Sequence, residues 1–173
     1  MRKFYLFASI IAATALFASC KKNDSAPEAQ VVKEILVSLA AANENPQPTG
    51  RTERGTATIK IYNDNSITVD AALTGFSTTD NLTLAHIHAG DPVTNGPVVL
   101  DLMPAFTGST LKSNVKGIRT SLIDSLKAGT ADLYLNIHST QVGSGIVRGQ
   151  LFNEVTFAAS VALSGANEVP SVT

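Results

Sequence analysis

The sequence predicts an all-β protein, an antiparallel sandwich or barrel with one short helix. Apolar residues alternate with polar ones through residues 56–62 and again through residues 67–73. Alternation with a period of two places one apolar row on a single face of a strand. Turn-forming Gly, Pro, Asn, Asp and Ser also interrupt the apolar segments at short intervals along the chain. Many short strands separated by such turns are typical of all-β domains.

The first two strands are predicted to form a hairpin. Asn63, Asp64, Asn65 and Ser66 lie between them. Asn and Asp tolerate left-handed backbone conformations and bond to their own main chain, which favours a tight turn. A calcium loop is the alternative, but the segment lacks the spaced carboxylates and the terminal glutamate of an EF-hand.

Five further strands and one helix complete the predicted domain. The helix begins near Ser121, whose spacing to Asp124 matches a capping box, and ends at Gly129. Leu122, Ile123 and Leu126 are its predicted apolar side. The strands are predicted at residues 34–41, 82–88, 97–102, 131–138 and 145–152.

The N-terminal segment predicts export and lipid attachment. Arg2 and Lys3 precede an apolar stretch that is short for a membrane-spanning helix and typical of a signal peptide over residues 1–19. Its end at Cys20 resembles a bacterial lipobox, in which the cysteine is lipidated and becomes the mature N-terminus. Cys20 is the only cysteine, so a disulfide within one chain is excluded. Residues 20–33 are polar and are predicted to form a flexible tether to the domain at residues 34–153.

This interpretation predicts a protein of the bacterial cell envelope, anchored to the outer membrane through the lipid on Cys20. Periplasmic and surface exposure both remain open. The formal net charge is −1, and no cluster of Lys and Arg resembles a nucleic-acid-binding surface.

The end of the chain repeats its beginning. Seven of fifteen positions are identical when residues 35–49 are aligned with residues 159–173, including the Asn43-Glu44 and Asn167-Glu168 pairs. Residues 154–173 are therefore predicted to be the start of a second, truncated repeat. The alternative is a last strand of the same sheet.

Three motifs resemble those of the CHRD domain family. They are the segment before Pro46 with its counterpart at residues 163–170, residues 85–90 followed by 95–99, and residues 134–139 followed by 145–151. The resemblance covers nearly all of residues 34–153. It implies a fold similar to the Greek-key barrel of copper-zinc superoxide dismutase. It also implies a non-catalytic envelope module that binds a protein or glycan partner, and we expect no enzymatic activity.

The three histidines of the chain lie in these motifs and are candidate metal ligands. His86 and His88 are two residues apart on a predicted strand and so project from the same face. The family's topology would bring His138 close to them. Three histidines are the ligand set of an open copper or zinc site, and Asp91 or Asp101 is a candidate oxygen ligand. The alternative is structural, with the histidines bonding to backbone carbonyls or Asn136. Dismutation would need further histidines, and the chain has none.

Arg148 and Glu44 are the remaining charged residues in the motifs. A dismutase-like arginine beside a metal would attract anions. The sequence favours a structural ion pair between Arg148 and Glu44 instead. No nucleotide-binding or hydrolase motif is present.

Overall fold

The computed structural model describes residues 28–152. The predictions for the signal peptide at residues 1–19, for Cys20 and for the repeat at residues 154–173 lie outside this range. Within the described part of the chain, no helix is long and apolar enough to cross a membrane.

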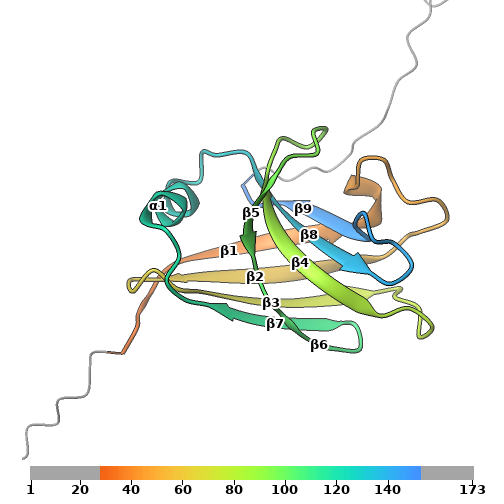
Figure 1. Cartoon of the computed structure of the whole chain (residues 1–173), viewed down its shortest axis with the longest axis horizontal. Helices are drawn as coiled ribbons and strands as arrows, with labels where there is room; N and C mark the ends of the chain where they lie inside the picture. Colours follow the sequence, from red (N-terminus) through yellow and green to blue (C-terminus); the bar gives the residue numbers. More distant parts are fainter. Residues whose placement is uncertain (1–27, 153–173) are drawn as a thin grey trace, which may run out of the picture.

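The described residues form one curled, nine-stranded antiparallel sheet, as the alternation predicts (Figure 1). The order across the sheet is β5-β4-β8-β9-β1-β2-β3-β7-β6, so strands from the two ends of the domain are neighbours. The strands are β1 (Val31–Ala40), β2 (Arg54–Tyr62), β3 (Ile67–Thr74), β4 (Leu82–Ala89), β5 (Val98–Asp101), β6 (Ala105–Thr107), β7 (Thr110–Val115), β8 (Leu133–Ser139) and β9 (Val147–Gln150).

The predicted hairpin is confirmed. The predicted start of the first strand is wrong, and the structure contains a second hairpin that was not predicted. Asn65 has a φ of 61° in the turn between β2 and β3, and Asp64 accepts hydrogen bonds from both the N–H and the hydroxyl of Ser66. Strand β1 begins at Val31, so residues 31–33, which the sequence assigns to the tether, belong to the sheet. The hairpin of β6 and β7 was not predicted.

The predicted helix is present as α1 (Thr120–Ala128), and it lies at one end of the sheet (Figure 1). Leu122, Ile123 and Leu126 are buried, and Gly129 ends the helix in the left-handed conformation, as predicted. The predicted capping box is wrong. The residue before the helix is Arg119, and no side chain caps the helix there.

The two faces of the sheet have different chemistry. Alternate residues of every long strand, such as Ile59, Val69, Ile87 and Leu135, form the apolar core and are completely buried. The opposite face of β8 and β9 is also buried, but its side chains are polar, and the same face of β4 adds the half-buried His86 and His88 beside the exposed Leu84. This polar face consists of His86, His88, Tyr134, Asn136, His138, Arg148 and Gln150.

Candidate metal centre

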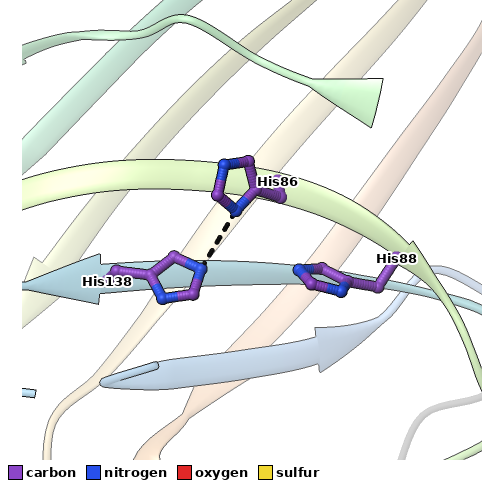
Figure 2. A group of neighbouring side chains, drawn as sticks. All are labelled: His86, His88 and His138. Atoms are coloured by element: carbon purple, nitrogen blue, oxygen red, sulfur yellow. Dashed lines mark hydrogen bonds between the residues drawn. The ribbon is translucent and has the colours of Figure 1, made fainter. Parts of the chain in front are cut away.

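The structure brings the three predicted histidines together on the polar face. His86 and His88 project from β4, and His138 projects from the neighbouring strand β8 (Figure 2). One ring nitrogen from each histidine lies within 4.8 Å of the others. The shortest separation is 3.1 Å, between His86 Nδ1 and His138 Nε2. In a tetrahedral zinc site with Zn–N distances of about 2.0–2.1 Å, two ligand nitrogens are about 3.3 Å apart. The His86–His138 pair is therefore already near ligand spacing, and the widest pair of nitrogens, at up to 4.8 Å, has to close by about 1.5 Å to reach it.

Backbone carbonyls determine which nitrogens of two histidines face the cluster. The Nδ1–H of His88 donates to Gly96 O at 2.9 Å, and the Nδ1–H of His138 donates to Gly143 O at 3.0 Å. In a neutral imidazole the other nitrogen, Nε2, then carries a lone pair. His138 Nε2 accepts the Nδ1–H of His86, whereas His88 Nε2 is buried without a hydrogen-bond partner among the described residues.

The same environment keeps two of the histidines neutral near pH 7. Burial lowers the pKa of His88 below 6.5, the Gly96 carbonyl opposes this shift, and the nearby charges of His86 and Arg148 lower the pKa further. Burial also lowers the pKa of His138 against the effect of the Gly143 carbonyl. A metal binds only the neutral imidazole, so both groups are in the binding form at neutral pH.

Arg148 fixes the loop that carries Gly96. Its guanidinium is almost completely buried, stacks on Tyr134 at 3.4 Å from the ring centre, and donates to the carbonyls of Asp91 and Thr94. Tyr134 stacks in turn on His88 and accepts the Gly96 N–H. Position 96 requires glycine, because the loop passes so close to β4 that a Cβ there would lie 1.4 Å from the Ala89 carbonyl oxygen. Arg148 thus contributes to the position of His88 from the far side of Tyr134.

The predicted ion pair between Arg148 and Glu44 is not formed. Arg148 bonds to the 90–97 loop instead, and Glu44 Oε2 accepts from Asn136 Nδ2 at 3.3 Å. Burial raises the pKa of Glu44 to about 7, although the charge of Arg148 and the Asn136 bond both lower it. A protonated Glu44 can also donate to the otherwise unpartnered Asn136 Oδ1. This acid–amide pair lies against Gly145, where a Cβ would come within 2.7 Å of both side chains.

Asp80 anchors the loop that carries Gly143. It is buried in the loop before β4 and accepts hydrogen bonds from Ser139, Thr140 and the Gln141 N–H. It also forms an ion pair with Arg51 at 2.6 Å. Burial alone raises the pKa of Asp80, but the hydrogen bonds from Thr140, Ser139 and Arg51 outweigh it and lower the pKa to about 2. Asp80 is therefore ionised in the folded protein.

Neither candidate oxygen ligand joins the cluster. The Asp91 carboxylate accepts the Val93 N–H within its own loop. Asp101 lies on β5 opposite His86, but its Oδ1 is 4.0 Å from His86 Nε2, the nitrogen that faces away from the cluster. The candidate ligand set is therefore the three histidines alone.

Two important residues, Tyr134 and Asp80, were not predicted from the sequence. Tyr134 shares one face of its strand with Asn136 and His138 by the same period of two that placed His86 and His88 together, so a signal for it was present. Asp80 gave no comparable signal, because its side-chain partners Arg51, Ser139 and Thr140 lie 29, 59 and 60 residues away along the chain.

The protein is thus an antiparallel β domain that carries a cluster of three histidines on the polar face of its sheet. A family model for the CHRD domain matches residues 35–151. The chain therefore belongs to the CHRD domain family, and this membership points to a binding or interaction module. Comparisons with curated proteins and with solved structures return no match. The similarity to the superoxide dismutase barrel therefore stays a prediction.

Proposed function

We propose that this CHRD domain is a metal-binding module that holds one zinc or copper ion on His86, His88 and His138. The observation that carries the proposal is the convergence of one ring nitrogen from each histidine within 4.8 Å. Buried polar atoms normally have hydrogen-bond partners. His88 Nε2 is buried, and its lone pair is directed at the two other imidazoles without a hydrogen-bond partner in residues 28–152. A cation shared by the three histidines would provide the missing partner.

The hydrogen bonds around the cluster support binding over a purely structural role. Metal-ligating histidines generally donate their second ring nitrogen to a carbonyl or carboxylate, which fixes the ring orientation. Gly96 O and Gly143 O accept such bonds from His88 and His138. If the histidines only held the strands together, the bonds to the Gly96 and Gly143 carbonyls would be enough for that role. A purely structural role gives no reason for His88 Nε2 to be buried without a hydrogen-bond partner in the described domain.

The donor set selects the class of metal. Neutral imidazoles suit zinc and copper, whereas calcium and magnesium prefer oxygen ligands. Three protein ligands leave one position for water or an external ligand, as in open zinc sites. Divalent copper generally binds nitrogen ligands more tightly than zinc, so copper should displace zinc.

Titration of chelator-treated protein with Zn²⁺ and Cu²⁺ tests the proposal. We expect one equivalent bound per chain at pH 7.5. The affinity should fall as the pH is lowered below about 6.5, because protons then compete for the imidazole lone pairs. Calorimetry in a weak competing buffer measures both quantities. Binding that is absent or does not saturate at one equivalent would contradict the proposal.

We also propose that the module is held at the outer membrane through a lipid on Cys20, which would place the metal site in the cell envelope. The support is the lipobox-like sequence that ends at Cys20. Cys20→Ala should abolish incorporation of labelled fatty acid, and continued labelling would contradict the anchor. The protein or glycan partner stays a prediction.

A further inference from the structure

We infer that Asp101 is a positioning residue for the metal site, acting through His86 without binding the ion itself. This inference rests on the proposed function and names the group that orients the third histidine. His88 and His138 have backbone carbonyls behind them, and His86 has the Asp101 carboxylate. Asp101 Oδ1 lies 4.0 Å from His86 Nε2, and the two residues are direct partners across β4 and β5.

His86 differs from the other two histidines in the nitrogen that it turns to the cluster. Its Nδ1 faces His138 Nε2 at 3.1 Å. The hydrogen-bond network assigns the proton to His86 Nδ1, because the Nδ1–H of His138 already donates to Gly143 O and leaves only a lone pair on its Nε2. A cation at the cluster needs the His86 Nδ1 lone pair, so this proton has to leave Nδ1.

The neutral ring that binds a cation through Nδ1 carries its single proton on Nε2. That N–H then lies toward the Asp101 carboxylate, whose Oδ1 is 4.0 Å from His86 Nε2 and has to approach by about 1 Å to accept it. Asp101 is itself held in place, because its Oδ1 accepts the Met103 N–H at 2.9 Å. A carboxylate behind a ligating histidine fixes the ring orientation and makes the ring a stronger donor to the metal.

The expected size of the effect follows from exposure. Loss of such an outer partner typically costs 10–100-fold in metal affinity. The Asp101 side chain is 57 % exposed, so solvent screens its charge and the lower end applies. We expect Asp101→Asn to weaken zinc binding by about tenfold. The asparagine can keep the Met103 bond, so the metal-free melting temperature should not change.

Asp64→Asn is the matched control. Asp64 accepts the N–H of the residue two positions later, as Asp101 does, but it lies in the turn between β2 and β3. It should leave zinc affinity unchanged, and Asp101→Glu should restore part of the loss. In the zinc-loaded wild type, ¹⁵N NMR should place the His86 proton on Nε2, and Asp101→Asn should make that proton exchange faster with water.

The competitive zinc titration of wild type, Asp101→Asn and Asp64→Asn separates the outcomes. A tenfold loss confined to Asp101→Asn supports the inference. If the wild type binds zinc and Asp101→Asn binds it with the same affinity, the inference is overturned but the proposed function is not. A loss well above a hundredfold would also overturn it, because Asp101 would then be a direct ligand. A wild type that binds no zinc would overturn the proposed function together with the inference.

Discussion

Replacement of Asp80 by asparagine should lower the free energy of unfolding by about 3 kcal/mol at pH 7, the lower end of the range for breaking a buried ion pair. The carboxylate accepts from Arg51, Ser139, Thr140 and two backbone N–H groups, and its side chain is fully buried. Asparagine removes one acceptor oxygen and the charge. The lower end of the range applies because Arg51 keeps its second partner, Glu53, at 2.9 Å.

The difference between wild type and Asp80→Asn should depend on pH in a defined direction. Because the folded-state pKa of Asp80 is lowered to about 2, its ionised form stabilises the fold fully above the unfolded value of about 3.9. This contribution is lost as the pH falls through about 2, so the two proteins should converge in acid. Urea unfolding at pH 7 and at pH 3 measures the trend.

Asp70→Asn provides the control for Asp80→Asn. Asp70 pairs with Lys112 at 3.3 Å, but both side chains are more than half exposed. Exposed pairs contribute less than about 1 kcal/mol. Equal destabilisation by the two substitutions would contradict the role given to the buried Asp80 network.

Removal of one ligand should abolish most of the stabilisation by zinc. At a free zinc concentration of 100 times Kd, binding to the folded state alone adds about 2.7 kcal/mol to the stability of the wild type. We expect His88→Ala and His138→Ala each to raise Kd at least 100-fold, since even outer partners contribute 10–100-fold. At the same zinc concentration each variant should then gain about 0.4 kcal/mol or less.

The comparison uses the zinc-dependent change within each protein, so the loss of stability caused by each substitution itself cancels. His88→Ala also removes the stack on Tyr134, and the variant is expected to melt earlier without metal. Thermal melting with and without zinc provides the measurement. A gain in His88→Ala or His138→Ala equal to that of the wild type would show that zinc binds elsewhere.

The alternation of apolar residues predicted most of the sheet because burial of one face is a strong local constraint. It predicted β2, β3 and the common face of His86 and His88. Strand β7 was missed because Ser113 occupies a core-side position, where its hydroxyl donates to the Leu102 carbonyl. The capping box failed because the residue at the N-cap is Arg119, two positions before Ser121.

The candidate site was predictable in its ligands but not in its surroundings. His86 and His88 share a face by spacing, and the family resemblance placed His138 beside them. The carbonyls of Gly96 and Gly143 leave no mark in the sequence, since every residue carries one. The pairing of Arg148 with Glu44 was wrong because opposite charge alone does not show that the Asp91 and Thr94 carbonyls occupy the guanidinium.

X-ray absorption on protein loaded with one equivalent of zinc tests the three-histidine site most directly. The spectrum should show three imidazole nitrogens at about 2.0–2.1 Å and one further light atom in the first shell. His138→Ala should lose one imidazole from that shell. A wild-type spectrum with fewer than three imidazoles, or one that His138→Ala leaves unchanged, would contradict a site formed by His86, His88 and His138.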